Sequence, residues 1–333
     1  MKILLNYRMP FSLAHGGLVI QIQQTMAALQ QLGVDVEPVR WWDENQTGDL
    51  IHYFGRMPVD QIHLAQQKRI KVVMAELLTE QGSRSIRQLR IQKLFSRTLA
   101  RVAPRNFTAA FQWDSYHHAD ACVALTAWEK HLMEYMFGAD PARTFVVPNG
   151  VETVFFAAPP APRGPWLVCT ATITERKRVL PLAQAAVAAS VPVWIIGLAY
   201  AENDPYAQQF FQFARQNPRF IRYEGGISDR AKLAGIYRSA RGFALLSDQE
   251  SLSLSALEAL ACECPLLLSD LPWATRSFNQ GTQFCPLTDS VSVTAQALRR
   301  FYDAAPTLPC GPKPAAWADV ARQFLAIYQQ VLR

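Results

Sequence analysis

The 333-residue sequence lacks several features that would assign it to a class of protein at once. It has no uninterrupted run of 18 or more apolar residues, so it predicts no transmembrane helix. The first apolar run is short and soon meets Asn6, Arg8 and Pro10, which is not the pattern of a signal peptide. We therefore expect a cytoplasmic protein whose first residues form a buried strand.

Paired metal-binding or redox motifs are also missing. The six cysteines include no C-x-x-C, and the only close pair is Cys262 and Cys264. Without a secretion signal, we expect reduced thiols that mostly fill the core. No second cluster of Cys or His stands at ligand spacing, so no metal site is predicted. No G-x-G-x-x-G follows a predicted strand, which argues against a two-domain NAD enzyme.

The composition that is present fits a globular protein, because half of the residues are hydrophobic and the mean hydropathy is close to zero. A chain of this length favours two domains. The formal net charge is +6. That charge suits an anionic ligand, a nucleic acid or an anionic membrane surface, and it does not choose among them.

Apolar strand-like runs alternate with helical patterns along the whole chain, which predicts parallel sheets covered by helices. The proline-rich segment AAPPAPRGP, residues 157–165, has the composition of a linker. We predict an α/β fold of two doubly wound, Rossmann-like domains facing a cleft, with ligands bound beyond the carboxyl ends of the strands. The predicted parts are an N-terminal domain over 1–156, a C-terminal domain over 166–312 and an amphipathic terminal helix within 313–333.

Two carboxylates, Glu250 and Glu258, stand in the otherwise apolar segment ESLSLSALEALACECP. Glu250 follows a predicted strand, and Glu258 lies in a helix for which Ser253 or Ser255 is the candidate N-cap. Free N–H groups at a helix start can bind a phosphate, and carboxylates accept hydrogen bonds from sugar hydroxyls. Glu258 could equally serve only the helix macrodipole. Both interpretations stay open on the residues alone.

Basic and glycine-rich segments also follow predicted strands. Arg176, Lys177 and Arg178 stand between a strand and a helix, where they could clamp a diphosphate. The alternative is a solvated basic turn, although the position after a strand favours function. Gly16 and Gly17 would allow a ligand to approach the backbone closely, but two adjacent glycines are common in turns.

Several segments, taken in order, resemble the GT4-type retaining glycosyltransferases of the GT-B fold. The similar segments are HGGLVIQIQQTMAALQQLG, the stretch from ADACVALT to PNGVETVFF, TITERKR, YEGGISDRAKLAGIYRSARGFALLS and ESLSLSALEALACECPLLLSD. The tail from Trp317 to Tyr328 is similar to the terminal helix of that family, which crosses back toward the first domain. The resemblance is strong in the C-terminal half and weak between residues 40 and 115.

The resemblance implies a hexosyltransferase that moves a sugar from a nucleoside diphosphate-sugar to a hydroxyl of a glycan or lipid-linked acceptor. It implies retention at the anomeric carbon, no metal or other cofactor, and UDP as the commonest nucleotide. Glu258 would bind the ribose, Glu250 the donor sugar, and Arg176 with Lys177 the diphosphate. The remaining implied donor-binding positions are Gly16, Gly17, Gly226, Ile227, Ser251, Leu252, Ser253 and Leu254.

Some positions depart from the family pattern. Thr172 stands where an arginine is usual, and Ser251 to Ser253 replace a glycine-containing loop. Glu76 stands near the position of the family's histidine, so we take it as the candidate catalytic residue of the N-terminal domain. The other candidates are His52, His117 and His118. These departures leave open an alternative, a binding or scaffold protein that kept the fold with little or no activity.

Between Gln81 and Trp113 there is no acidic residue but seven cations, from Arg84 to Arg105. On a helix over 84–105 most of these cations share one side, and apolar residues lie opposite. Such a helix can lie on an anionic membrane, here the inner face, or bind an acidic partner. It could also be a surface helix with its apolar face in the core. Nucleic-acid binding is not expected, because aromatic residues are not interleaved with the cations.

Overall fold

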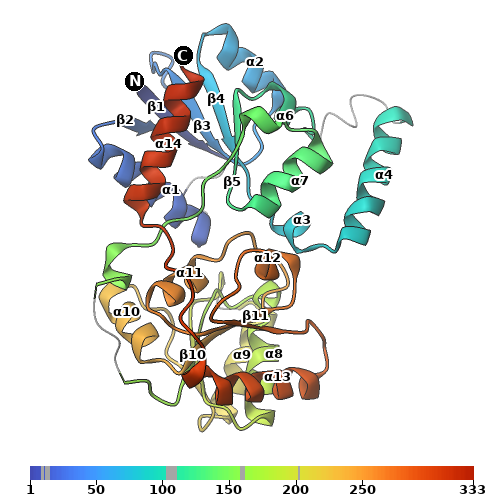
Figure 1. The fold of residues 1–333 in the computed structure, drawn as a ribbon, viewed down its shortest axis with the longest axis vertical. Helices are drawn as coiled ribbons and strands as arrows, with labels where there is room; N and C mark the ends of the chain where they lie inside the picture. Colours follow the sequence, from blue (N-terminus) through green and yellow to red (C-terminus); the bar gives the residue numbers. More distant parts are fainter. Residues whose placement is uncertain (9–10, 12–15, 103–110, 158–161, 202) are drawn as a thin grey trace. The chain divides into compact units, whose positions relative to one another are not determined.

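The computed structural model describes residues 1–333 except 9–10, 12–15, 103–110, 158–161 and 202. The chain divides into two compact units (Figure 1). Unit 1 comprises Met1–Gly150 and Ala315–Arg333, and unit 2 comprises Val151–Pro314. Among the described residues, no helix combines the length and apolar character needed to span a bilayer.

Unit 1 is built on a six-stranded parallel sheet with the order β2-β1-β3-β4-β5-β6. Its strands are short apolar runs, and β4 and β5 are buried along almost their whole length. The strands are β1 (Lys2–Tyr7), β2 (Asp35–Pro38), β3 (Leu50–Phe54), β4 (Lys71–Ala75), β5 (Ala121–Ala124) and β6 (Thr144–Val146). The helices are α1 (Gly17–Gln31), α2 (Val59–Gln67), α3 (Thr79–Ser83), α4 (Ile86–Val102), α6 (Ser115–His118), α7 (Ala127–Phe137), the short η2 (Pro141–Arg143) and α14 (Trp317–Val331).

Unit 2 repeats this plan with a second six-stranded parallel sheet, in the order β12-β11-β10-β7-β8-β9. Its strands are β7 (Leu167–Thr170), β8 (Val193–Ile196), β9 (Ile221–Tyr223), β10 (Gly242–Leu245), β11 (Leu266–Ser269) and β12 (Thr282–Cys285). Its helices are η3 (Thr153–Phe155), η4 (Glu175–Lys177), α8 (Val179–Ala188), α9 (Pro205–Gln216), α10 (Arg230–Ser239), α11 (Leu254–Ala261), α12 (Pro272–Thr275), α13 (Val291–Ala304) and η5 (Ala305–Thr307).

In each sheet the strand order reverses direction next to the first strand of the unit, β1 or β7, which is the mark of a doubly wound fold. Two Rossmann-like units of this kind confirm the predicted α/β class of two doubly wound domains. The cleft between them stays a prediction.

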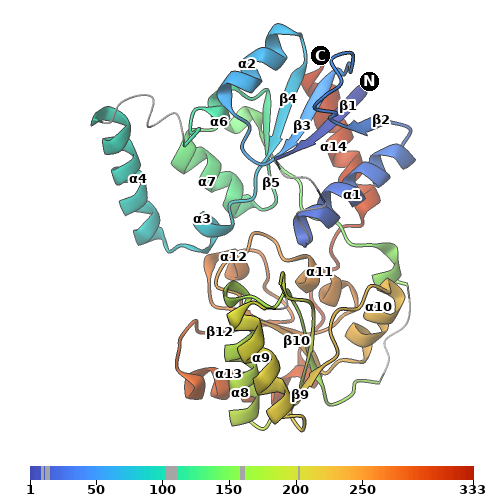
Figure 2. The same ribbon diagram turned by 180° about the vertical axis from the view of Figure 1, so that it is seen from behind.

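The last helix, α14, belongs to unit 1, where it packs on α1 (Figures 1 and 2). Val320, Phe324 and Ile327 form its apolar face, and all three are buried. Tyr328 reaches the sheet, and its hydroxyl lies 2.6 Å from Nδ1 of His52 in β3. The amphipathic pattern of the tail is therefore used to cover the first sheet.

The segment after Gly150 packs in unit 2, although its sequence suggested the first domain up to residue 156. Phe155 is buried, its ring centroid lies 6.0 Å from that of Tyr237, and its carbonyl accepts a hydrogen bond from Sγ of Cys262 at 3.3 Å. Apolar packing thus places the boundary several residues before the proline-rich segment. Residues 158–161 of the predicted linker lie outside the described residues.

Candidate functional site

The segments that follow β7 and β10 meet at one edge of the second sheet, because these two parallel strands are neighbours. Lys177 in η4 forms an ion pair with Glu250, which follows β10. Arg176 Nη1 lies 3.7 Å from the same carboxylate, and Ser247 Oγ donates a hydrogen bond of 2.8 Å to its Oε1 atom. The structure therefore brings together Arg176, Lys177 and Glu250, three residues that the sequence analysis selected.

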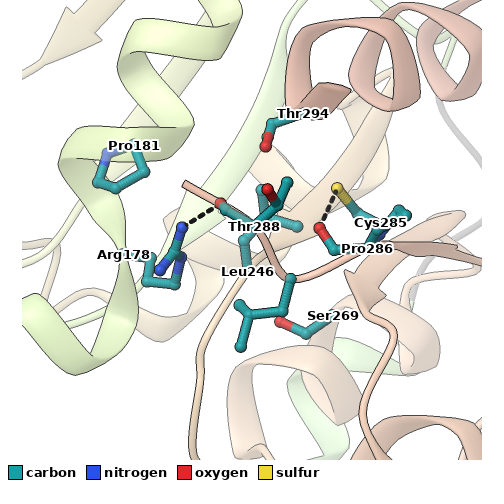
Figure 3. A pocket seen from close by; sticks show the side chains of 9 residues that line it. Arg178, Pro181, Leu246, Ser269, Cys285, Pro286, Thr288 and Thr294 are labelled. Atoms are coloured by element: carbon teal, nitrogen blue, oxygen red, sulfur yellow. Dashed lines mark hydrogen bonds between the residues drawn. The ribbon is translucent and has the colours of Figure 1, made fainter. Parts of the chain in front are cut away.

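Arg178, the third cation of the run, turns away from Glu250. Its backbone is left-handed, with φ 50° and ψ 38°, and it stands directly before α8. Its guanidinium donates to the carbonyl of Thr288 at 2.5 Å and lies 3.2 Å from Asp289 (Figure 3). The pocket drawn there holds about 10 Å³, roughly the room for one water molecule. Of the three consecutive cations, Arg176 and Lys177 therefore lie at Glu250, whereas Arg178 is bound to Thr288 and Asp289. That these cations clamp a diphosphate stays a prediction.

Glu258 lies in α11, whose N-cap is Ser253. The Oγ atom of Ser253 accepts a hydrogen bond from the N–H of Ala256 at 3.4 Å. Glu258 is beyond the first turn of that helix, where a macrodipole effect has fallen off, so the macrodipole does not account for it. It is 5 % exposed, and burial raises the pKa of its carboxyl although neighbouring Arg230 acts in the opposite direction. Arg230 forms an ion pair with it, and the Tyr237 hydroxyl lies 3.4 Å away.

The loop from β9 to α10 carries Gly226 and Ile227. Gly226 is exposed and lies against Leu198; a Cβ atom there would be 3.0 Å from Cγ of that side chain. The helix begins with Asp229 as its N-cap, since the Asp229 side chain accepts from the N–H of Lys232 at 3.0 Å.

The serine-containing loop that departs from the family pattern is tightly packed. Ser251, Leu252 and Ser253 are all buried, and Leu254 begins α11. The hydroxyl of Ser253 serves the helix as its cap and contacts the Ser255 hydroxyl at 3.1 Å. The two candidate caps, Ser253 and Ser255, therefore have different roles, and Ser253 is the cap.

The glycine pair of unit 1 stands at the start of α1, beyond the carboxyl end of β1. Gly16 is the N-cap residue, with φ 125°, a backbone conformation that favours glycine. Gly17 is the first residue of the helix and is exposed. His15, which precedes them, lies outside the described residues.

Glu76 directly follows β4 and is held by two side chains that the sequence analysis did not select. Arg56, which lies just after β3, donates through Nε to Oε2 of Glu76 at 2.9 Å, and the Tyr116 hydroxyl donates to the same oxygen. The guanidinium of Arg56 also donates to the carbonyl of Phe111 at 2.9 Å and lies 4.5 Å from the ring centroid of Phe137. Glu76 is thus a paired carboxylate in a half-buried polar network.

Glu129, in the first turn of α7, fixes the loop that carries Glu76. Its two carboxylate oxygens accept from the backbone N–H groups of Leu78, at 2.9 Å, and Leu125, at 3.0 Å. The side chain is 1 % exposed. The signal that could have found Arg56 is its position in the loop after a strand, whereas Glu129 resembles any acidic residue in a first helical turn.

The histidine candidates have other roles. His52 is fully buried in β3, stacked on Phe54 with ring centroids 4.2 Å apart, and burial lowers its pKa to about 3. It is therefore a neutral core residue. His117 and His118 are exposed on the short helix α6, and Nδ1 of His118 lies 3.1 Å from Nε2 of His63.

Helix α4 presents both cations and apolar side chains to solvent. Leu89 is its buried anchor, and Lys93 lies 3.5 Å from the ring centroid of Tyr135. Large apolar residues on the other side are 67–75 % exposed: Ile91, Leu94, Phe95 and Val102. Exposed cations stand beside this stripe at Arg87, Arg90, Arg97 and Arg101. In both views α4 stands apart from the sheet of unit 1 (Figures 1 and 2). The interpretation that its apolar face belongs to the core is wrong for these residues.

Within the described part of the chain, no group of three or more His, Cys, Asp or Glu side chains is arranged to hold a metal ion. Five cysteines are buried and Cys310 is exposed.

Comparison with known proteins agrees with this architecture. Residues 164–304 match the model of the family Glycosyl transferases group 1. A search of curated proteins gives no match. Among solved structures, sucrose-phosphate synthase from Thermosynechococcus elongatus is similar at a TM-score of 0.67 and 16 % identity, over 99 % of each chain. A glycosyltransferase from Rickettsia africae gives 0.67 at 13 % identity, over 99 % of this chain and 98 % of that chain.

The Anabaena protein HepE, solved in complex with UDP and glucose, gives a TM-score of 0.64 at 15 % identity, over 99 % of this chain and 98 % of that chain. At such identities the likeness establishes the fold, and the family match covers most of unit 2. Residues 164–304 therefore resemble the family Glycosyl transferases group 1, and the chain has the GT-B fold seen in glycosyltransferases of known structure.

Proposed function

We propose that the protein is a retaining glycosyltransferase that moves a sugar from a nucleoside diphosphate-sugar to a hydroxyl of a glycan or lipid-linked acceptor, without a metal. The observation that carries this proposal is the cluster of Arg176, Lys177 and Glu250 at the carboxyl edge of the second sheet. Two cations and a carboxylate at such an edge suit a ligand with both phosphates and hydroxyls.

The leaving group of this reaction is a nucleoside diphosphate, which gains negative charge as the glycosidic bond breaks. Arg176 and Lys177 stabilise that charge, the kind of electrostatic contribution that accounts for much of enzymatic rate enhancement. Lys177 is paired with Glu250 in the described structure, so a bound diphosphate would share or replace this contact. Glu250 can then accept a hydrogen bond from a hydroxyl of the donor sugar, whose anomeric carbon becomes oxocarbenium-like.

Glu258 binds the ribose in this proposal, and the loop with Gly226 and Ile227 borders the base. Residues 251–254 lie at the start of α11, where the polarity of a helix N-terminus favours the phosphates. UDP is the proposed nucleotide. The support for it is the HepE structure, which holds UDP and glucose in the same fold.

Gly16, Gly17 and Glu76 are the proposed contributions of unit 1. The glycines give backbone room for the donor, and Glu76 acts on the sugar or acceptor side. Both hydrogen bonds given above for Glu76 fall on Oε2, so its Oε1 atom can still accept from an acceptor hydroxyl. The carboxylate is positioned by Arg56 and, through the loop, by Glu129.

Thermal unfolding with a panel of nucleoside diphosphate-sugars tests the proposal. A donor should raise the midpoint, and the enzyme should slowly release nucleoside diphosphate from it even without acceptor. Glu258→Ala should weaken that binding, whereas Asp289→Ala, at a fully exposed carboxylate, should not. If none of the sugar nucleotides shifts the midpoint at about millimolar concentration, the transferase proposal fails. If a donor binds but no nucleoside diphosphate is ever released, the alternative of an inactive binding protein is favoured.

We also propose that α4 binds the protein peripherally to an anionic membrane, which would suit a lipid-linked acceptor. The specific support is the exposed stripe of Ile91, Leu94, Phe95 and Val102 beside exposed arginines. Apolar area inserted among headgroups and cations near anionic lipids both contribute to such binding. Sedimentation with vesicles tests this proposal, and its variants are given in the Discussion.

A further inference from the structure

Arg230 connects two carboxylates of unit 2 that are far apart in the sequence. It is the first residue of α10, and its guanidinium forms an ion pair with Glu258 of α11. Its Nε atom lies 3.2 Å from Oε2 of Glu152, and its Cζ atom lies 4.7 Å from the ring centroid of Phe155. The planar fork of an arginine suits this bridging position, which a lysine could fill only in part.

The burial of Glu258 makes this partner important. The side chain is 5 % exposed, and burial raises the pKa of its carboxyl. The negative charge of Glu152 also raises the pKa of Glu258, whereas Arg230 lowers it. A buried carboxyl that loses its cation tends to take up a proton. In the protonated form it has fewer acceptor sites for hydroxyl groups.

The other titratable groups that face Glu258 stay protonated near neutral pH. Tyr237 of α10 is fully buried, which raises its pKa well above the ordinary value. Burial raises the pKa of Cys262, which ends α11, to about 12. Arg230 is therefore the cation among these neighbours that offsets the effect of burial and of Glu152.

We propose that Arg230 is a positioning residue that keeps Glu258 ionised and oriented to accept hydrogen bonds from both ribose hydroxyls of the donor nucleotide. The inference rests on the proposed function and assigns a role to a residue that the sequence analysis did not select. Arg230 begins the helix that follows the loop with Gly226 and Ile227. It thus links the loop proposed to border the base with the carboxylate proposed to bind the ribose.

The test compares the affinities for UDP and for its 2′-deoxy analogue, by calorimetry, between about pH 6 and about pH 9. The ratio of the two affinities cancels the titration of the phosphate groups. In the wild type the preference for UDP should stay constant over this range. In Arg230→Met the preference should disappear at the acidic end and return at the alkaline end. The affinity for UDP should fall about tenfold per pH unit below the new pKa of Glu258.

Three further variants make the result specific. Arg238→Met is the matched control, because Arg238 is on the same helix and donates to the carbonyl of Val154, at 3.2 Å, instead of to a carboxylate. It should keep the wild-type pH profile. Arg230→Lys keeps the cation and should restore most of the preference at the acidic end. If Arg230→Met does not fold, Arg230→Gln serves as the uncharged variant and is compared with Arg230→Lys.

The outcomes separate the two proposals. A wild type that binds neither nucleotide overturns the proposed function and this inference together. The inference alone is overturned if the wild type prefers UDP but the uncharged Arg230 variant shows no pH dependence of that preference, as Arg238→Met should show none. A merely structural role would lower the melting temperature of the variant without making its ribose preference depend on pH.

Discussion

The ammonium group of Lys177 is paired with the carboxylate of Glu250, a residue 73 positions further along the chain. The two parallel strands that precede them, β7 and β10, are neighbours in the sheet and bring them to one edge. Arg176 contributes to the same site, and its own carbonyl accepts from the N–H of Asp248 at 3.0 Å. The site therefore depends on the pairing of two strands and not on one contiguous motif.

Replacing Lys177 and replacing Arg178 should have different consequences. Lys177→Ala removes a cation proposed to face the leaving group, so turnover should fall by about 10²–10³. Arg178→Ala should leave turnover nearly unchanged but lower the free energy of unfolding by about 1 kcal/mol, because it loses its bond to the Thr288 carbonyl. Release of nucleoside diphosphate and thermal unfolding measure the two effects. Equal losses of turnover in both variants would contradict the different roles given to Lys177 and Arg178.

Glu76→Gln should reduce sugar transfer without changing the affinity for the donor nucleotide. The amide keeps the size of the side chain but leaves the charge of Arg56 unbalanced. The free energy of unfolding should therefore fall by about 1–3 kcal/mol. Glu80→Gln is the matched control, since Glu80 lies four residues later, is about half exposed and pairs with Arg84. Transfer to an acceptor and binding of the nucleoside diphosphate are measured separately. An unchanged transfer rate in Glu76→Gln would remove it from the catalytic assignment.

The buried His52 should make the stability of the protein depend on pH. Its pKa is lowered from 6.5 to about 3 in the folded protein by burial, so the unfolded chain takes up the proton first. The stability it contributes is present above about pH 6.5 and is lost as the pH falls toward 3, at up to about 1.4 kcal/mol per pH unit.

The double variant His52→Phe with Tyr328→Phe removes both hydrogen-bonding partners and should flatten this part of the pH profile. His118→Phe, at an exposed position, should keep it. Urea unfolding at about pH 7 and about pH 5 measures the difference. A double variant with the wild-type pH dependence would show that another group is responsible.

Binding of α4 to membranes should depend on charge and on apolar insertion in separable ways. The wild type should sediment with vesicles that contain anionic lipid, and less with purely zwitterionic ones. Replacing Arg90, Arg97 and Arg101 with Gln should abolish binding at low salt, since each cation contributes about 1 kcal/mol. Replacing Ile91, Phe95 and Val102 with Ser should leave binding at low salt and abolish it at physiological salt.

The control for the apolar variant is Trp42→Ser, because Trp42 is 87 % exposed but lies outside α4. It should sediment as the wild type does. A wild type that stays in the supernatant at low salt would refute the proposal, and binding to zwitterionic and anionic vesicles alike would refute its electrostatic part.

Most strands of the second sheet could be predicted from sequence because they are short apolar runs next to helical patterns. The edge strand β12, with the mixed sequence TQFC, has no such signal. The choice of a capping residue and the directions of neighbouring side chains could not be predicted. Ser228 and Asp229 are adjacent and both can cap a helix, and only the path of the backbone after β9 selects Asp229. Arg176, Lys177 and Arg178 are consecutive, and the left-handed backbone at Arg178 separates their directions.

Long-range partners were hidden from the sequence for a related reason. Arg56 meets Glu76 from 20 residues away, and Arg230 meets Glu258 from 28 residues away. Neither pair follows the spacing of one helix or one strand, so strand order decides which side chains meet. The charge pattern of α4 could be recognised, whereas the exposure of its apolar stripe depends on how the helix is attached to the rest of unit 1.

Because α14 belongs to unit 1, the two units differ in when they can form during protein synthesis. Unit 2 is one continuous segment and can fold once residue 314 has left the ribosome. Unit 1 has most of its residues much earlier, but until the last helix is made, His52 has no Tyr328 to contact and the α1 side of its sheet is incompletely covered. In nascent chains, unit 2 should therefore become resistant to proteolysis before unit 1, although unit 1 is made first.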